Sequence, residues 1–504
     1  MVNDRNNSRK ITSPQSLNAY VKSICDIMRR SNCAGALQYV PELTWMLFLR
    51  ILDEQEGREA EQAQAVGAPF QPSLEYPYRW QDWAAPEGKK RSELQEGTLG
   101  AFISFVNGRL IPALRGLKDR PGATVRQKVI SQVFSSVERT KIDTERNLLD
   151  ILDRVHELRT ENVVETHMFT LSQVYEGLLQ NMGAKNNDGG QFFTPRQIIT
   201  AMVQTLNPRI GQTVYDPCCG TGGFLAQSYS YMSAQEQSAE DIEALKNSTF
   251  YGREKEDLVY PIALANLILH GIDEPHIWHG NALTGQEVYG GLFGSAPALY
   301  DVVLTNPPFG GKEGKEAQTH FAYKTRATQV LFLQHIIDSL KHGGQCGIVM
   351  DEGTLFRTTE TAFVQTKRKL LNECDLWCIV SLPAGVFMNA GAASKTNLLF
   401  FTKGEPTENI WYYDLSDLHI TKKQPLAAEN FKEFLQLLPE RTSGEHSWTI
   451  SMEEIKNRNY DLKAVNPNRK REEDARTPEE LLSIIEMQQA EISRAVAALR
   501  SRGL

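Results

Sequence analysis

The 504-residue chain is long enough for roughly three domains of ~150 residues, and its 41% hydrophobic and 23% charged residues are typical of a globular protein. No apolar run approaches the ~18 residues that span a bilayer, and residues 1–10 are too polar for a secretory signal. The seven cysteines form no C-x-x-C pair. We therefore expect a cytoplasmic protein without membrane contact, disulfide framework or metal site. The net charge of −8, from 54 basic and 62 acidic residues, argues against unaided tight binding to DNA, because neutralising phosphates supplies most of that affinity.

Residues 1–168 are predicted to form a helical amino-terminal domain. Apolar residues recur there at spacings of three and four, as at Leu43, Leu47 and Ile51. Residues 56–97 contain four prolines and are predicted to be a long connector between helices. The aromatic residues of this connector could stack on bases, but we expect them to anchor it to a helical bundle.

Residues 169–420 alternate between short β-rich runs and helical stretches. This alternation predicts βαβ units and a doubly wound, Rossmann-like α/β domain whose parallel sheet is covered by helices on both faces. The expected strands are 213–215, 249–251, 301–305, 345–350, 376–382, 397–402 and 410–413, and the expected helices include 257–270, 327–341 and 360–371.

Residues 421–504 are predicted to be a linker followed by a helical tail that binds a partner. A charged stretch at 469–474 precedes a strong helix start, with Thr477 as the N-cap and Pro478 at the first position. Apolar residues between Leu481 and Leu499 then fall on one stripe, which requires a partner helix in this chain or in another subunit.

A glycine-rich turn follows the first predicted strand of the α/β domain. Residues 216–224 read Asp-Pro-Cys-Cys-Gly-Thr-Gly-Gly-Phe and lead into a helix, which is typical of a nucleotide-type cofactor site at the carboxyl edge of a parallel sheet. In the run Gly220-Thr221-Gly222, the glycines would let the backbone approach the ligand, and the helix start offers free N–H groups. Asp216 precedes this run. A tight strand-to-helix turn without a ligand would need the same glycines.

Glu254 ends the next predicted strand, 38 residues after Asp216. An acid at this place in a doubly wound sheet accepts hydrogen bonds from ribose hydroxyls, usually ~20 residues after the glycine turn. A helical insertion at 233–246 would explain the longer separation. A surface acid with no ligand is the alternative interpretation.

The sequence Asn306-Pro307-Pro308-Phe309 follows the apolar strand of residues 302–304. The two prolines force a rigid exit from the strand, so that the Asn306 side chain and the Pro307 carbonyl can point at one amino group. Two acceptors on an amine make its lone pair available as a nucleophile, and Phe309 offers a ring on which a planar base can stack. A proline-stiffened turn without chemistry is the alternative.

These motifs together resemble the modification subunits of type I restriction–modification systems, a family of DNA amino-methyltransferases that use S-adenosylmethionine (AdoMet). Similar stretches also occur at 343–349, 382–387 and 459–462, so the resemblance covers nearly the whole chain. It implies that Asn306, Pro307, Pro308 and Phe309 carry the chemistry and that Asp216, Gly220, Thr221, Gly222 and Glu254 hold AdoMet. It further implies that an upstream stretch closes over the methionine end of the cofactor: Gly190, Gln191, Phe192, Phe193, Thr194 and Pro195. Asn281 stands where many relatives have an acid near the adenine ring of AdoMet.

The resemblance therefore implies methylation of the N6 amine of a flipped adenine in duplex DNA. The expected partner is a separate specificity subunit bound by two methylase copies, with restriction or translocase subunits as further candidates. Methylation of cytosine N4, methylation of protein glutamine, and a catalytically silent assembly subunit are the alternatives. Residues 310–326 carry four basic and two acidic side chains, so we expect this loop to meet DNA phosphate, with a solvated loop as the runner-up.

Overall fold

The computed structural model describes residues 14–31, 33, 36–157, 194–235, 237–285, 296–387, 395–421, 424, 426–468 and 477–501. Three sequence-based predictions lie outside these residues: the domain boundary at 168/169, the cofactor contacts of 190–193, and the charged linker at 469–474. Among the described helices, none combines the length and the apolar character needed to cross a bilayer.

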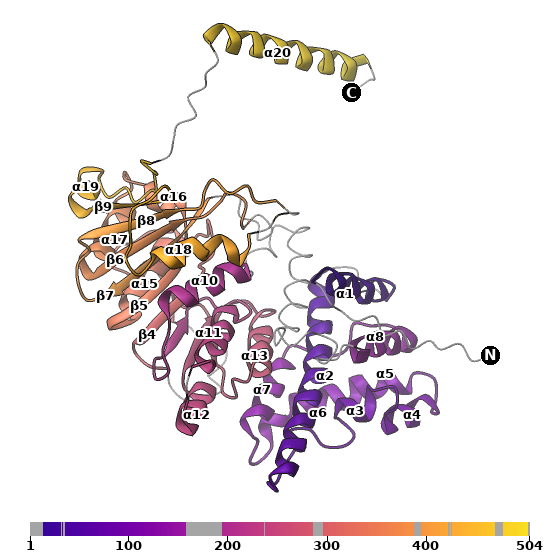
Figure 1. The fold of residues 1–504 in the computed structure, drawn as a ribbon. Helices are drawn as coiled ribbons and strands as arrows, with labels where there is room; N and C mark the ends of the chain where they lie inside the picture. The colour runs from indigo at the N-terminus through magenta and orange to yellow at the C-terminus, as the bar shows by residue number, and fades with distance from the viewer. Residues whose placement is uncertain are drawn as a thin grey trace.

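The amino-terminal part is helical, as predicted, and forms one side of the molecule in Figure 1. Its elements are α1 (Pro14–Arg29), α2 (Ala36–Ala65), α3 (Trp80–Trp83), α4 (Lys89–Gln95), α5 (Ala101–Phe105), the π-helical η1 (Val106–Leu110), α6 (Ile111–Arg115), the 3₁₀ turn η2 (Leu117–Asp119), α7 (Val125–Val133) and α8 (Glu145–Glu157).

The long connector predicted over 56–97 is wrong in extent. Helix α2 continues to Ala65, because no proline lies between Pro41, near its start, and Pro69, and its charged residues are good helix formers. Helices α3 and α4 occupy much of the remainder. The anchoring role of the connector's tryptophans is confirmed. Trp83 is fully buried and its ring lies 6.4 Å from that of Trp45 in α2, so the aromatic rings belong to the helical core.

The α/β part contains a nine-stranded sheet with the order β3-β2-β1-β4-β5-β7-β6-β8-β9. The strands are β1 (Val214–Asp216), β2 (Phe250–Glu254), β3 (His276–His279), β4 (Tyr300–Thr305), β5 (Leu340–Asp351), β6 (Cys374–Ser381), β7 (Thr396–Lys403), β8 (Asn409–Asp414) and β9 (Ser447–Ser451). All seven predicted strands are present, whereas β3 and β9 were not predicted from the sequence.

The prediction of a parallel sheet holds for β3-β2-β1-β4-β5 and for the β6–β8 pair, but it is wrong at β7 and β9. Strand β7 runs antiparallel to both of its neighbours, β5 and β6. A parallel neighbour needs a crossover connection, usually a helix, and the described part of the connection at 382–395 contains no helix, which fits an antiparallel return of β7 beside β6.

Helices cover both faces of the sheet, which confirms the doubly wound prediction. On one face, α10 (Arg196–Leu206), α11 (Gly223–Ser233) and α13 (Tyr260–Leu269) join the larger apolar core, and on the other α15 (Thr328–Ser339) and α17 (Thr361–Glu373) cover a second core. The remaining elements are α12 (Ala239–Asn247), α14 (Lys315–Thr319), α16 (Glu352–Phe356), η6 (Ala428–Phe431), α18 (Lys432–Leu437), α19 (Met452–Asn457) and α20 (Pro478–Ser501).

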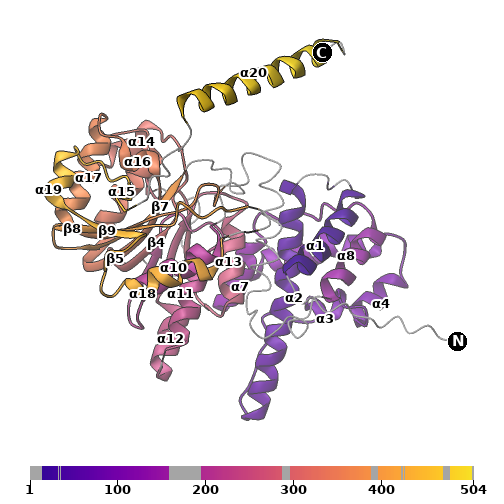
Figure 2. The same cartoon turned by 45° about the horizontal axis from the view of Figure 1, so that its top comes forward.

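Helix α20 projects away from the rest of the molecule in both Figure 1 and Figure 2. Its predicted start is confirmed by a capping box, in which the Thr477 amide donates to Glu480 Oε2 at 2.7 Å and the Glu480 amide donates to Thr477 Oγ1 at 3.2 Å. Large apolar side chains on this helix are exposed to solvent: Leu482, Ile485, Met487, Ile492 and Val496. The apolar surface predicted to need a partner is thus uncovered in the single chain.

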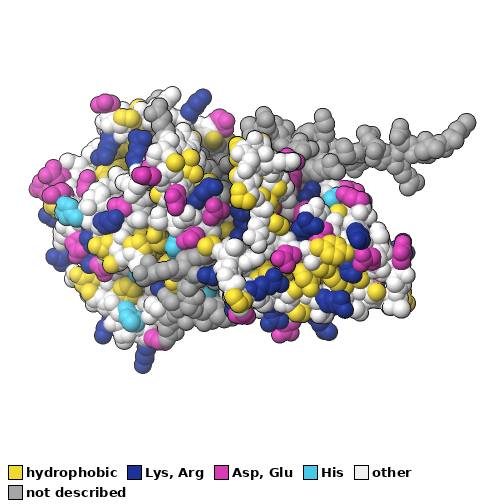
Figure 3. Space-filling model, turned by 90° about the horizontal axis from the view of Figure 1, so that it is seen from below, with side chains coloured by type: hydrophobic (Ala, Val, Ile, Leu, Met, Phe, Trp, Pro, Cys, Tyr) yellow, Lys and Arg dark blue, Asp and Glu magenta, His cyan; other side chains and the backbone are white. Residues whose placement is uncertain are grey.

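Charged side chains of both signs are interspersed over the face of the molecule seen in Figure 3, among scattered apolar residues. This distribution agrees with the small negative net charge of the whole sequence. On this face, a mixed surface of this kind offers DNA phosphates no extended basic field.

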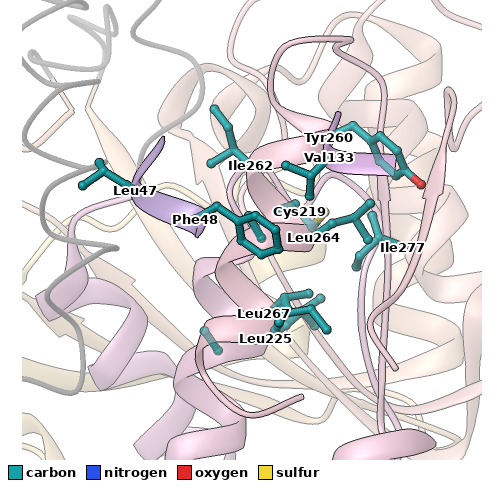
Figure 4. Packing of buried hydrophobic residues seen from close by; sticks show 14 of the residues in the cluster. Leu47, Phe48, Val133, Cys219, Leu225, Tyr260, Ile262, Leu264, Leu267 and Ile277 are labelled. Atoms are coloured by element: carbon teal, nitrogen blue, oxygen red, sulfur yellow. The ribbon is translucent and has the colours of Figure 1, made fainter. Parts of the chain in front are cut away.

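The amino-terminal helices pack directly on the α/β part through α13. Figure 4 shows Phe48 of α2 and Val133 of α7 beside Leu264 of α13, and all three side chains are fully buried in one continuous core. At the edge of this contact, Arg126 of α7 donates to Glu59 of α2 at 2.7 Å and to Asp273, beyond α13, at 3.4 Å. Apolar packing and a bridging guanidinium thus fix the two parts together.

Candidate active site

One cavity of about 240 Å³ follows the carboxyl ends of four neighbouring strands. In sheet order these are β4, β1, β2 and β3, which end at Thr305, Asp216, Glu254 and His279. The residues just beyond each strand line the cavity: Asn306 and Pro308 after β4, 217–221 after β1, Lys255 and Glu256 after β2, and 280–282 after β3. We call this space the edge cavity. The edge cavity extends past the ends of four strands. Its volume is far larger than a few water molecules need.

Asp216 holds the glycine turn to the neighbouring strand. Its side chain is buried, and Oδ1 accepts hydrogen bonds from the Cys218 amide at 3.1 Å and from Thr305 Oγ1 at 2.6 Å. Burial raises the pKa of Asp216 to about 7 although both hydrogen bonds act in the opposite direction. The carboxyl group of Asp216 therefore binds the glycine turn and β4, and it also lines the edge cavity.

The turn after Asp216 requires glycine. Gly220 and Gly222 have φ angles of 55° and 80°, in the left-handed region that residues with a Cβ rarely adopt. A Cβ at residue 222 would also lie 3.2 Å from the side chain of Leu267 in α13. The turn consequently presents bare backbone to the edge cavity.

Glu254 at the end of β2 reaches across to this turn. Its Oε2 accepts from the Gly220 amide at 2.8 Å, and Oε1 accepts from the Glu256 amide at 2.8 Å. Burial raises the pKa of Glu254 to about 7. Each carboxylate oxygen can accept further hydrogen bonds, so the group can still serve a ligand in the edge cavity.

The side-chain amide of Asn306 has a hydrogen-bond partner at its nitrogen, and none among the described residues at its oxygen. The Nδ2 group donates to Thr194 Oγ1 at 3.0 Å, whereas the buried Oδ1 accepts no hydrogen bond from any described residue. A buried acceptor without a donor costs free energy, on the order of 1–3 kcal/mol. The Oδ1 atom of Asn306 is therefore an acceptor open to a donor from a ligand, since the described residues supply none.

The sequence did not point to Gln329, which supports the same motif from α15. Its buried Nε2 donates to the Pro307 carbonyl at 3.3 Å, and its Oε1 accepts from the Asp351 amide, at the end of β5, at 3.0 Å. One lone pair of the Pro307 carbonyl is thus engaged, and one remains.

Phe309 packs against a second aromatic ring. Its ring lies 5.4 Å from that of Phe387 at an interplanar angle of 68°, and Phe309 is not among the described residues that line the edge cavity. Phe387 comes from the 382–387 stretch that the sequence comparison with the family singled out. The two rings join the Asn-Pro-Pro-Phe motif to that stretch.

The structure describes only two residues of the upstream stretch that was predicted to close over the cofactor, Thr194 and Pro195. Gly190, Gln191, Phe192 and Phe193 lie outside the described residues, while Thr194 lines the edge cavity and Pro195 immediately precedes α10. The Thr194 hydroxyl brings this stretch to Asn306.

Asn281 is held by two hydrogen bonds at the far end of the edge cavity. Its Oδ1 accepts from the Leu283 amide at 2.9 Å, and its Nδ2 donates to Glu313 Oε2 at 3.3 Å. Sequence reasoning counted Glu313 only as a charge on the loop after the Asn-Pro-Pro-Phe motif. The structure places it inside the edge cavity.

The loop at 310–326 is ordered by a backbone bridge between Lys312 and Ala327 and by the short helix α14. Of its two acidic side chains, Glu313 is turned inward and Glu316 is exposed. Its four basic side chains are all exposed: Lys312, Lys315, Lys324 and Arg326. The outer face of the loop is therefore more basic than its composition suggests. Contact with DNA remains a prediction.

The thiol of Cys218 is not set up as a nucleophile in the structure. Cys218 lies in the edge cavity, but burial raises the pKa of its thiol well above the ordinary value, so the nucleophilic thiolate is disfavoured. Within the described ranges, no cluster of three or more His, Cys, Asp or Glu side chains is placed to hold a metal ion.

A doubly wound sheet with a glycine turn, an acid on the next strand and an Asn-Pro-Pro-Phe motif at one edge cavity is the architecture of an α/β amino-methyltransferase. The N-6 DNA Methylase family model matches residues 166–476, and the HsdM N-terminal domain model matches residues 17–165. The chain is 33% identical over 502 residues to the type I restriction enzyme EcoEI methylase subunit of Escherichia coli, across 96% of this chain and 97% of that protein. It belongs to the N-6 DNA methylase family, among the methylase subunits of type I restriction enzymes.

Further relatives agree with this assignment. The EcoKI methylase subunit of Escherichia coli is 29% identical over 456 residues, which cover 86% of this chain and 78% of that protein. Among solved structures, a modification subunit of a putative type I restriction enzyme from Vibrio vulnificus matches with a TM-score of 0.77 and 33% identity over 91% of this chain and 98% of that one. A chain from a structure on complex assembly and conformational transition of the type I restriction–modification system matches with a TM-score of 0.71 and 37% identity over 97% and 98%.

Proposed function

We propose that this chain transfers a methyl group from AdoMet to the N6 amine of an adenine that is flipped out of duplex DNA. Among the alternatives raised by the sequence, the N-6 DNA methylase family favours adenine over cytosine N4 and over protein glutamine. The observation that carries the proposal is the buried Oδ1 of Asn306, an acceptor at the edge cavity for which the described residues supply no donor.

The edge cavity fits AdoMet in chemistry. The turn at Gly220 and Gly222 gives a ligand close access to backbone, and Glu254 offers carboxylate oxygens to ribose hydroxyls. AdoMet, when bound, supplies a methyl group on a positively charged sulfur, which is already a good electrophile. The protein's task is then to hold the two reactants in line and to exclude other acceptors.

The adenine amine is positioned by two acceptors in our proposal. Asn306 Oδ1 accepts one hydrogen of the amine, and the remaining lone pair of the Pro307 carbonyl accepts the other. Both interactions draw the amine's lone pair away from the ring and toward the methyl group. Thr194 and Gln329 fix the orientation of the two acceptors, since the Thr194 hydroxyl accepts from Asn306 Nδ2 and Gln329 donates to the Pro307 carbonyl.

The target base must leave the helix to reach this pair of acceptors, because an amine inside the base stack is not accessible to the pocket. Phe309, which is half-buried and backed by the buried ring of Phe387, supplies aromatic surface beside the motif on which an extruded adenine can stack. The exposed cations of the 310–326 loop would meet the phosphates on either side of the flipped nucleotide.

We further propose that a separate specificity subunit selects the DNA sequence and is bound by two methylase copies. The net charge of −8 disfavours strong binding of DNA by this chain alone, and the face seen in Figure 3 carries charges of both signs. The uncovered apolar side chains of α20 supply a docking helix for such a partner.

Methyl transfer from tritiated AdoMet tests the proposal. The full chain, with its specificity subunit, is given duplexes that contain or lack adenine, and label should enter only the adenine-containing DNA. Asn306→Ala should reduce transfer by at least ~100-fold while AdoMet affinity stays within about twofold, because the side chain positions the base and its loss leaves the glycine turn intact. Asn409→Ala, at an exposed position that begins β8, is the matched control and should retain full activity. Near-normal transfer by Asn306→Ala would contradict the mechanism.

A further inference from the structure

Glu313 occupies the end of the edge cavity that lies farthest from Asn306 in sheet order. The cavity runs from Asn306 beyond β4, past the glycine turn beyond β1 and Glu254 beyond β2, to Asn281 beyond β3. Glu313 is only seven residues after Asn306 in the sequence, yet its carboxylate contacts Asn281 at the other end. The chain from the catalytic motif to Glu313 therefore spans the length of the ligand site.

The contacts of Glu313 hold it in this position. Its amide donates to the Arg326 carbonyl at 2.9 Å, and its Oε1 accepts from Thr328 Oγ1 at 3.2 Å. Asn281 Nδ2 donates to its Oε2 at 3.3 Å. Two donors occupy only part of the acceptor capacity of a carboxylate, which has about four lone-pair positions.

The surroundings of Glu313 suit a flat, apolar ring with one polar edge. Ala282 and Phe332 line the cavity here and belong to a small apolar cluster with Leu283, Ala317 and Leu331. Asn281 is the weaker candidate for the acceptor, because its neutral Oδ1 already accepts from the Leu283 amide and its Nδ2 is turned to Glu313. The carboxylate of Glu313 is thus the strongest acceptor at this end of the cavity for a ligand amine.

We infer that Glu313 accepts a hydrogen bond from the exocyclic amine of the cofactor's adenine and thereby makes the site specific for an adenosyl group. The inference rests on the proposed function, since it takes the ligand of the edge cavity to be AdoMet. Glu254 lies at the ribose position, so the base attached to that ribose extends one strand farther from β1, toward β3 and Glu313. The acid expected beside the ring thus comes from the loop after the catalytic motif, while position 281 carries the amide that orients it.

Binding of two stable cofactor analogues tests this inference. S-adenosylhomocysteine has the exocyclic amine, and S-inosylhomocysteine has a carbonyl oxygen in its place. The wild-type chain should prefer the adenosyl form by about tenfold or more in calorimetry, because the inosyl carbonyl faces a carboxylate and loses a charged hydrogen bond. Glu313→Gln should lower that preference at least fivefold, since an amide can donate to the carbonyl as well as accept from the amine.

Three comparisons make the result decisive. Glu405→Gln, on an exposed turn after β7, should keep the wild-type preference. The double variant Asn281→Asp/Glu313→Gln exchanges the acid and the amide and should restore the preference for the adenosyl form. Glu313→Ala, whose melting temperature verifies folding, should lose the preference without gaining affinity for the inosyl form. An unchanged preference in both Glu313→Gln and Glu313→Ala would overturn the inference and leave the proposed function standing, whereas a wild-type chain that binds neither analogue would overturn both.

Discussion

At the scale of single residues, two buried carboxyl groups at the edge cavity determine how the site responds to pH. Asp216 and Glu254 both have their pKa raised to about 7 by burial, from values near 4 in an unfolded chain. Each group therefore gains or loses its proton near neutral pH. A protonated Glu254 has fewer lone pairs to offer to hydroxyl donors, so its ionised form is the one that suits ribose.

Cofactor affinity should accordingly rise as the pH passes upward through about 7. We expect AdoMet to bind more tightly at pH 8 than at pH 6, and Glu254→Gln to weaken binding at pH 8 by roughly tenfold, the typical effect of losing hydrogen bonds to a charged group. Calorimetry at the two pH values measures both effects. The variant should show a smaller pH response than the wild type, and an equal response in the two proteins would exclude Glu254 as its source.

At the scale of elements, the turn between β1 and α11 connects the sheet to the ligand. Its backbone geometry demands left-handed residues, and the Gly220 amide is bonded to Glu254 from the next strand. Adjacent elements are thus coupled at the point where the cofactor would bind.

Gly220→Val should therefore abolish measurable AdoMet binding. A branched side chain in a left-handed conformation costs roughly 1–2 kcal/mol and would also occupy space next to the ligand. Gly211→Val is the matched control, because Gly211 has a φ of 92° but no atom within 4 Å of an added Cβ. The control should lose stability and keep its affinity. Equal affinity in folded Gly220→Val, measured by calorimetry, would show that the turn does not contact the cofactor.

At the scale of the whole molecule, the chain is one fixed body with a projecting helix. Apolar packing on α13 and the bridge through Arg126 join the amino-terminal helices to the α/β part, while α20 stands apart with its apolar side chains uncovered. An uncovered stripe of this kind is stabilised when a partner buries it.

Deleting residues 477–504 should weaken assembly with the specificity subunit by at least tenfold and leave AdoMet affinity unchanged. The full-length variant Ile485→Lys/Ile492→Lys should have the same effect, because it places charges in the apolar stripe. Light scattering of the purified mixture measures assembly, and calorimetry measures the cofactor. Normal assembly of both variants would mean that the partner binds elsewhere.

The sequence alone determined the features that neighbouring residues encode. The glycine turn, the rigid Asn-Pro-Pro-Phe exit from β4 and the capping box of α20 each depend on a few consecutive side chains, so their positions were predictable. Seven strands and the two-sided helical covering followed from alternation along the chain. The family resemblance was predictable for the same reason, because it rests on these local motifs.

Only the tertiary structure decided what meets across the sheet. The reversed insertion of β7 between β5 and β6 depends on strand pairing between distant segments, which local pattern does not specify. The same holds for Gln329 at the Pro307 carbonyl and for Glu313 beside Asn281, side chains whose neighbours come from other elements. A hydrogen bond forms only within about 3 Å, and residues distant in sequence reach that distance only after strand order and register are set.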